Sequence, residues 1–247
     1  MIVSSSIWQS SVFKWNFTLM RRLDLLECYP LNNGEVSDRD RQFHDAAVKN
    51  GWPTRPLHET KYANNAHDFA HIAADHGGAN NAFNMLLEQK LKDSPVYRNW
   101  IGSMPNLYEV PGIKNYRDER ITPSLLQELG GLSATLSPGQ FLFHGGAWPG
   151  ELKVGSRVRI DRPFSTSLNA NPAIAHAYKD DREVKRGIHL WVIEVGNAFY
   201  QPVYVYNIIS QRKFKQEFEV LIHPGSEAVC QGVDYSGECT VISVLLN

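Results

Sequence analysis

Two acidic side chains, Glu217 and Glu219, stand one residue apart in the stretch KFKQEFEVLIHPG, residues 213–225. The three residues after Glu219 are strong strand formers, and a Pro-Gly pair ends the run. In a strand, residues two apart point to the same face, roughly 6.6 Å apart at about 3.3 Å per residue. Two carboxylates on one face can divide catalytic work: one stabilises a cation while the other accepts a proton. The simpler alternative is an edge strand whose charged face discourages aggregation.

A second candidate fragment is FLFHGG, residues 141–146, in which a hydrophobic strand ends at His144. A histidine in this place can hydrogen-bond a ligand hydroxyl or phosphate. Gly145 and Gly146 would let a ligand approach the backbone closely. The alternative is a histidine at an ordinary glycine-rich turn.

A third fragment is PFSTSLNANPAIAHAY, residues 163–178. Ser165 and Ser167 share one face of the expected strand, and Thr166 points to the other face. An Asn-Pro pair then opens a helix, so the strand end and the helix N-terminus lie close together. Such a junction suits hydroxyl contacts and anion binding. A polar strand end followed by a capping motif is the alternative.

The elements that must position these fragments differ between the two halves of the chain. In the first half we expect a helix that Ser37 caps and Gly51 ends. A second helical stretch runs from about Asn65 through residue 93, with a break near residues 77–78, and a third starts at Thr122-Pro123. Short strands are expected later, over residues 140–145, 156–160, 163–167, 188–195, 218–222 and 238–246, with one helix over residues 171–180.

This pattern predicts an α+β fold in three parts. Residues 1–36 are expected to be a flexible or leader segment, residues 37–131 a helical N-terminal region, and residues 132–247 a strand-rich core. The N-terminus lacks the basic start and apolar run of a Sec signal, but its serine content suits a non-cleaved export signal of an injected protein.

Composition excludes several classes of function. The chain has 247 residues, of which 43% are hydrophobic and 21% charged, which is ordinary for a globular protein. The net charge is −1, with 25 basic and 26 acidic residues, so a general nucleic-acid or membrane-surface binder is not indicated. Cys28, Cys230 and Cys239 are too few for a disulfide framework or a paired-cysteine metal site. No stretch approaches the roughly 18 consecutive apolar residues of a membrane helix.

Taken in this order, the three fragments resemble the mono-ADP-ribosyltransferase family. The arginine-directed branch of that family has a first-strand Arg-Gly, a Ser-Thr-Ser strand and a Glu-x-Glu motif entering a later strand. Residues 165–167 and 217–219 match the last two motifs. His144 stands where arginine is usual and is instead typical of the poly-ADP-ribose polymerase and diphtheria-toxin branch. The resemblance covers residues 138–247.

The resemblance implies the ADP-ribosyltransferase fold, in which two small packed antiparallel or mixed sheets form a cleft for NAD, here with a helical N-terminal extension. It makes residues 132–247 the expected catalytic core. The implied reaction transfers ADP-ribose from NAD to a macromolecular acceptor, foremost a protein arginine, releases nicotinamide and requires no metal. The implied partner is a protein acceptor; a nucleic-acid acceptor stays open, and the N-terminal region would bind the target, a chaperone or an inhibitor. Such an enzyme acts in the cytoplasm, including that of a host or target cell into which it is secreted or injected.

The resemblance also implies roles for single residues. Glu219 would hold the ribose 2′-hydroxyl and stabilise the cation-like transition state. Glu217 would orient or deprotonate the acceptor, and Ser165 would position Glu219. Tyr178 would stack on nicotinamide or, alternatively, pack against the sheet. The residues implied to bind NAD are His144, Gly145, Ser165, Thr166, Ser167 and Tyr178, and Phe214 would recognise the target.

Three other functions stay open. An NAD glycohydrolase would use water as the acceptor, and a catalytically silent interaction module would keep only the fold. A metal-dependent hydrolase is suggested by His67 and His71, which lie four apart on an expected helix with Asp68 and His76 close by. The glutamate of the HExxH motif is missing, so a polar helix face is the simpler explanation of these histidines.

Overall fold

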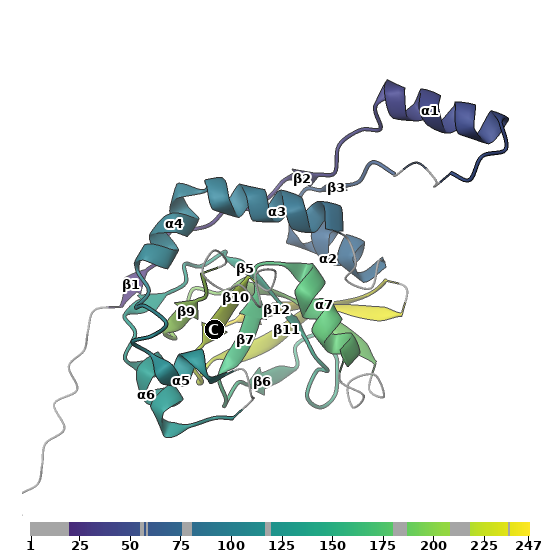
Figure 1. Ribbon diagram of the computed structural model, residues 1–247. Helices are drawn as coiled ribbons and strands as arrows, with labels where there is room; N and C mark the ends of the chain where they lie inside the picture. Colours follow the sequence, from purple (N-terminus) through teal and green to yellow (C-terminus); the bar gives the residue numbers. More distant parts are fainter. Residues whose placement is uncertain are drawn as a thin grey trace, which may run out of the picture.

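The computed structural model describes residues 20–54, 57, 59–75, 81–116, 120–179, 187–207, 218–236 and 238–247. The predicted α+β class is confirmed: a mixed sheet is covered by helices (Figure 1). The sheet has eight strands in the order β6-β11-β12-β8-β5-β7-β10-β9. Its strands are β5 (Phe141–Gly145), β6 (Arg157–Arg159), β7 (Phe164–Ser167), β8 (Ile188–Val195), β9 (Val203–Val205), β10 (Glu219–Ile222), β11 (Glu227–Ser236) and β12 (Cys239–Leu246).

The sheet narrows to a single residue pair between β5 and β7, where Phe143 lies opposite Ser167. On one side of this joint β12 and β8 pair in parallel along their whole lengths, from Cys239 opposite Ile188 to Leu246 opposite Val195. On the other side β10 pairs antiparallel with both β7 and β9. The two small sheets that were predicted correspond to a five-stranded and a three-stranded part of the mixed sheet, which are joined at this pair.

The helices begin where capping residues predict them. The Ser37 side chain accepts a hydrogen bond from Asp40 N, and the Thr122 side chain accepts one from Leu125 N. Ser94 caps α4 in the same way, a helix that our sequence analysis missed. The helices are α1 (Asp38–Lys49), α2 (Ala66–Asp75), α3 (Asn81–Asp93), α4 (Pro95–Gly102), α5 (Pro111–Lys114), α6 (Pro123–Gly130) and α7 (Ala170–Lys179).

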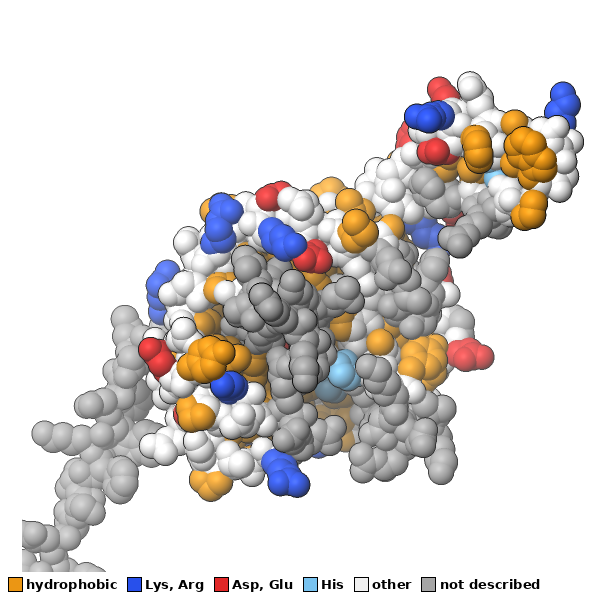
Figure 2. Space-filling model, in the orientation of Figure 1, with side chains coloured by type: hydrophobic (Ala, Val, Ile, Leu, Met, Phe, Trp, Pro, Cys, Tyr) orange, Lys and Arg blue, Asp and Glu red, His pale blue; other side chains and the backbone are white. Residues whose placement is uncertain are grey.

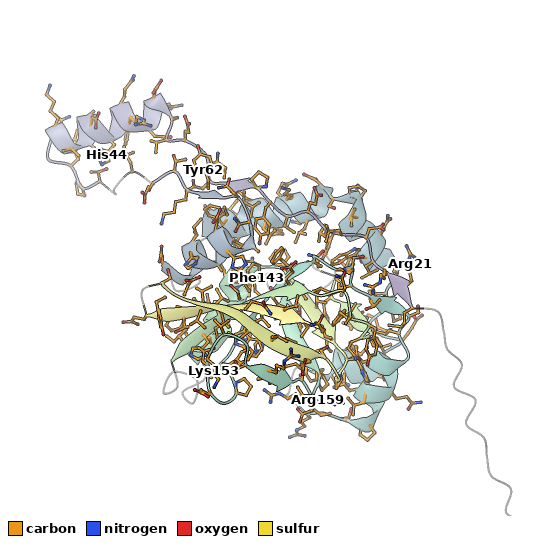
Figure 3. The ribbon with its side chains drawn as sticks, turned by 180° about the vertical axis from the view of Figure 1, so that it is seen from behind. Arg21, His44, Tyr62, Phe143, Lys153 and Arg159 are labelled. Atoms are coloured by element: carbon orange, nitrogen blue, oxygen red, sulfur yellow. The ribbon has the colours of Figure 1, made fainter. Side chains whose placement is uncertain are left out.

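One hydrophobic core joins both halves of the chain. Phe69 of α2 meets Phe143 of β5 edge to face, with ring centroids 5.8 Å apart, and lies 5.9 Å from Phe83 of α3. Figure 3 shows Phe143 between the strands and the helices that cover them. α2 also contacts α7, β8 and β12. The helical region is therefore packed onto the strand-rich core and is not a separate domain.

Residues 1–36 were predicted to form a flexible or leader segment; residues 1–19 lie outside the described part, and from residue 20 onwards the segment packs against the rest of the chain. Strand β1 (Arg21–Arg22) pairs in parallel with β4 (Ala134–Thr135). Leu23 and Leu26 follow it into the main core, where they are 2% and 5% exposed. Burial of these apolar side chains explains why the segment is ordered, although its local sequence has little helical or strand pattern.

Helix α1 stands away from the body of the molecule (Figure 1). The chain reaches it and returns through a short ribbon of β2 (Leu31–Asn32) and β3 (Tyr62–Ala63). Hydrophobic side chains lie on the surface of α1 (Figure 2). Phe43 within the helix is 72% exposed, and Trp52, three residues after its end, is 60% exposed. No described helix has the length and apolar character needed to cross a membrane.

Candidate active site

The centre of the candidate site is a hydrogen bond between two neighbouring strands. Antiparallel pairing of β10 with β7 places Glu219 opposite Ser167 and Leu221 opposite Ser165. Residues two apart on a strand share a face, so the side chains of Ser165 and Glu219 lie diagonally on the same face. Ser165 Oγ donates to Glu219 Oε1 over 2.7 Å. Both side chains are partly buried, so the serine fixes the carboxylate in one orientation.

His144 is tied to the same strand from the other side of the joint. Its Nδ1 lies 2.8 Å from the carbonyl oxygen of Ser165. A carbonyl oxygen can only accept, so Nδ1 carries the proton. The ring packs at 4.6 Å from the Phe164 ring and at 5.3 Å, edge on, from that of Trp191. The three predicted residues His144, Ser165 and Glu219 are thus brought together.

Burial lowers the pKa of His144 to about 4, and the nearby charges of Arg162 and His176 act in the same direction. The hydrogen bond to Ser165 opposes this shift without cancelling it. His144 is therefore neutral at physiological pH, with Nε2 as a hydrogen-bond acceptor. Gly146 lies beside this atom, since a methyl group there would be 2.9 Å from Nε2.

Gly145 has a packing role, and the close approach of a ligand to its backbone stays a prediction. A Cβ atom at this position would lie 1.7 Å from the carbonyl oxygen of Ala173 in α7. Such a contact is far inside van der Waals range, so only glycine lets α7 pack this closely on β5. Gly145 therefore fixes the distance between the helix and the strand that carries His144.

The other two hydroxyls of the Ser-Thr-Ser strand hold backbone groups. Thr166 points to the opposite face, as predicted, and its Oγ1 donates to Val220 O over 2.7 Å. Ser167 Oγ accepts a hydrogen bond of 2.9 Å from Asn169 N at the start of α7. Both residues are buried, 3% and 6% exposed. They fix the pairing of β7 with β10 and the turn into α7.

Tyr178 lies on α7 and is not among the residues that the hydrogen bonds of Ser165 bring together. It lies at the far end of α7, seven residues beyond Asn171 and therefore about 10 Å further along the helix axis. Its ring packs against the main core. Burial raises its pKa, and nearby Cys239 and Glu238 add to the effect. These contacts favour the alternative that Tyr178 packs against the sheet.

Glu217 and Phe214 lie outside the described residues. The placement of Glu217 and Glu219 on one face therefore stays a prediction; β10 itself begins at Glu219. The intervening Phe218 has φ 47° and is 2% exposed. A left-handed residue interrupts the alternation of a strand and costs about 1–2 kcal/mol. Burial of its ring and the bond from Leu168 N to its carbonyl oxygen, 3.0 Å, hold it in place.

An amide cluster that was not predicted from the sequence anchors the start of α7. Asn84 Oδ1 of α3 accepts hydrogen bonds of 2.8 Å from Asn169 Nδ2 and from Asn171 Nδ2. Asn169 Oδ1 in turn accepts from Asn171 N over 3.0 Å. The helical N-terminal region thereby supports the strand end beside the site. Asparagine is unfavourable inside a helix, so Asn84 within the apolar run AFNMLL was the available signal.

The histidines of α2 do not form a metal site with other described residues. His67 Nδ1 lies 3.4 Å from Ser243 Oγ, and its ring meets Phe141 edge on. Burial lowers its pKa, and His71 adds to this effect. Within the described part of the chain no group of three or more His, Cys, Asp or Glu side chains could hold a metal. His76 lies outside that part.

An open groove of about 760 Å³ lies elsewhere, between α4, α5 and α6. Met104, Val110, Gln127 and Leu132 contribute to its lining. The acidic side chain there, Glu128, accepts hydrogen bonds from Gly112 N, Ile113 N and Ser124 Oγ. Its carboxylate is thus used to join α5 to α6, and we place the chemistry at Glu219 despite the size of this groove.

No protein-family model and no curated protein matches the chain. Solved structures do resemble it. The ADP-ribosylating toxin BECa of C. perfringens, solved with NADH, is 14% identical with a TM-score of 0.42 over 76% of this chain and 51% of BECa, so this chain spans about half of BECa. Vis toxin from Vibrio splendidus is 16% identical with a TM-score of 0.35 over 82% and 90% of the two chains. Plx2a from Paenibacillus larvae is 10% identical with a TM-score of 0.41 over 65% and 96%.

These similar structures are ADP-ribosyltransferase toxins, the family that the sequence motifs resemble. The function proposed below rests on the geometry of this chain's own site and not on these similarities.

Proposed function

We propose that the protein is a mono-ADP-ribosyltransferase, which transfers ADP-ribose from NAD to a macromolecular acceptor and releases nicotinamide. One observation carries this proposal: Ser165 joins two residues that are distant from it in sequence. Its carbonyl oxygen accepts from His144, 21 residues earlier, and its hydroxyl donates to Glu219, 54 residues later. The motif residues thus form one hydrogen-bonded chain across three strands at the joint of the sheet.

The arrangement suits cleavage of the bond between nicotinamide and ribose. As this C–N bond breaks, its electron pair leaves with nicotinamide, and positive charge develops on the ribose carbon and ring oxygen. A carboxylate that is already oriented stabilises that charge without having to reorganise. Ser165 gives Glu219 this orientation, and Glu219 would also accept a hydrogen bond from the ribose 2′-hydroxyl.

Neutral His144 is suited to hydrogen-bond a sugar hydroxyl. With the proton on Nδ1, Nε2 can accept a hydrogen bond from a ribose hydroxyl but brings no positive charge to a phosphate. An arginine at the same place would bring such a charge. The histidine therefore supports recognition of NAD through its ribose, and the phosphates require another partner.

The acceptor that we propose is an arginine side chain of a protein. A guanidinium has a pKa above 12 and needs a base before its nitrogen can attack the ribose carbon. Glu217 would take the proton that this nitrogen loses, and Phe214 would contact the target protein. The exposed apolar residues of α1 support binding of the target, a chaperone or an inhibitor by the N-terminal region. Water or a nucleic acid as acceptor would define the competing activities.

Nicotinamide release from NAD, with and without candidate acceptor proteins, tests the proposal. Glu219→Gln should lower the release rate by about 100-fold or more, because it removes the negative charge that stabilises the transition state. Glu217→Gln should lower transfer to protein more than it lowers NAD cleavage. Glu194→Gln, on the exposed side of β8, is the matched control and should leave both rates unchanged.

Each outcome has a distinct meaning. Release that is equally fast without any acceptor would replace the transferase by an NAD glycohydrolase. Absence of release under all conditions would leave an interaction module. Equal loss of cleavage and transfer in Glu217→Gln would contradict the proposed division of work between the two acids.

A further inference from the structure

The proposed substrate brings two negative phosphate charges to a site whose described centre has little positive charge. Glu219 is acidic, and His144 is neutral at physiological pH because of its low pKa. A pyrophosphate that leaves water needs cationic partners, and arginine is the best suited because its planar guanidinium binds phosphate oxygens in pairs. One such arginine stands at the border of the site.

Arg162 lies in the short link between β6 and β7, directly before the Ser-Thr-Ser strand. The link is fixed at its beginning, where Ile160 N donates to Ser226 O over 2.9 Å and Ile160 O accepts from Gly225 N over 2.8 Å. It is fixed at its end by Phe164, which pairs with Ile222 and packs on the ring of His144. The backbone of Arg162 is therefore held at the border of the site.

The link is also supported from the helical region. Tyr116 OH donates to the carbonyl oxygen of Pro163, the residue between Arg162 and Phe164, over 3.1 Å. Pro163 itself is buried and has a fixed φ. Contacts at Ile160, Pro163 and Phe164 thus hold a link of four residues, and the arginine is carried on a fixed backbone.

Arg162 is exposed, and its positive charge helps to lower the pKa of His144. Among the described residues no acidic side chain forms an ion pair with Arg162, whereas Arg157 of the preceding strand pairs with Glu227 over 2.6 Å. Arg162 thus combines three properties of an anion-binding residue: a supported backbone, exposure to solvent and closeness to His144.

We propose that Arg162 binds the pyrophosphate of NAD and so makes the site selective for a dinucleotide over substrates without phosphate. This inference rests on the proposed function, because it names the residue that holds the charged part of that substrate. A residue that binds the pyrophosphate would touch neither the bond that breaks nor the acceptor. Arg162 is therefore expected to set the affinity for NAD and to leave the chemical step unchanged.

The experiment compares Arg162→Ala and Arg162→Lys with Arg159→Ala. Arg159 is the matched control, because it is an exposed arginine three residues earlier, on the edge strand β6 (Figure 3). NAD binding is measured by calorimetry, and nicotinamide release is measured from NAD and from nicotinamide riboside, which has no phosphate. Melting curves establish that each variant is folded.

Loss of a charged hydrogen bond predicts a Kd and KM for NAD about 10- to 100-fold higher in Arg162→Ala, with a smaller increase in Arg162→Lys. The value of kcat should change less than about threefold. The salt dependence of NAD binding should weaken. Nicotinamide riboside should be cleaved by Arg162→Ala as well as by the wild type, and Arg159→Ala should match the wild type throughout.

Wild-type affinity for NAD in Arg162→Ala, or an equal loss in Arg159→Ala, would overturn the inference. If the wild type binds NAD but releases no nicotinamide, the proposed function is wrong. The binding data then still test whether Arg162 binds the pyrophosphate. A wild type that binds no NAD would overturn both.

Discussion

The hydrogen bond between Ser165 and Glu219 makes a sharp prediction about rate. Ser165→Ala removes the hydroxyl that lies 2.7 Å from Glu219 Oε1 and adds no bulk. A hydrogen bond to a charged group contributes about 1.5–3 kcal/mol. If it acts by orienting the carboxylate for the transition state, this energy appears in kcat. At about 1.36 kcal/mol per factor of ten, the expected loss is about 10- to 150-fold, with KM changed less than about threefold.

Single-turnover release of nicotinamide from NAD is the assay, because it separates the chemical step from product release. Thr166→Val is the matched control on the same strand. It removes a hydroxyl that points to the other face and bonds Val220 O, so it should cost about 1 kcal/mol of stability and leave kcat unchanged. An increase in KM with normal kcat in Ser165→Ala would refute the orienting role. A similar loss of kcat in Thr166→Val would show that strand stability, not the carboxylate, controls the rate.

Two further predictions concern stability. Because the pKa of His144 is lowered from about 6.5 to about 4, the unfolded chain binds its proton first as pH falls. The free energy of unfolding should therefore decrease by up to about 3 kcal/mol between pH 6.5 and pH 4. His144→Asn should flatten that decrease in urea titrations, and an unchanged slope would contradict the low pKa. Gly145→Ala places a methyl group 1.7 Å from Ala173 O and should destabilise the protein by about 3 kcal/mol or more. Gly102→Ala, where no atom lies within 4 Å, should be neutral or up to about 1 kcal/mol more stable, and similar losses in both would refute the packing argument.

Local sequence patterns predicted many of the helices and strands, because capping and strand propensity depend on residues close together in the chain. Serine and threonine before a first helical turn capped α1 and α6, as expected. The continuous run of residues 188–195 formed β8 with the predicted bounds. Strand β11 was missed although it is the longest in the sheet, since Gly232 and Asp234 are poor strand formers. Pairing with β12 and β6 overrides that preference and accommodates Gly232 at a bulge.

The sequence by itself determined which side chains could do chemistry: the histidine at a strand end, the Ser-Thr-Ser strand and the acid that begins β10. It also determined the alternation that puts Thr166 on the face opposite Ser165, because that depends only on strand geometry. These properties involve residues close together along the chain, so a single sequence can express them.

Only the tertiary structure decided how the pieces meet. Strand order brings His144, Ser165 and Glu219 into one hydrogen-bonded chain, and packing of α7 explains Gly145. Phe218 has a left-handed backbone that non-glycine residues disfavour, and it is held by burial of its ring and by the hydrogen bond from Leu168 N. Such features depend on contacts between residues far apart in the chain, whose free energy exceeds the local preferences of any single residue.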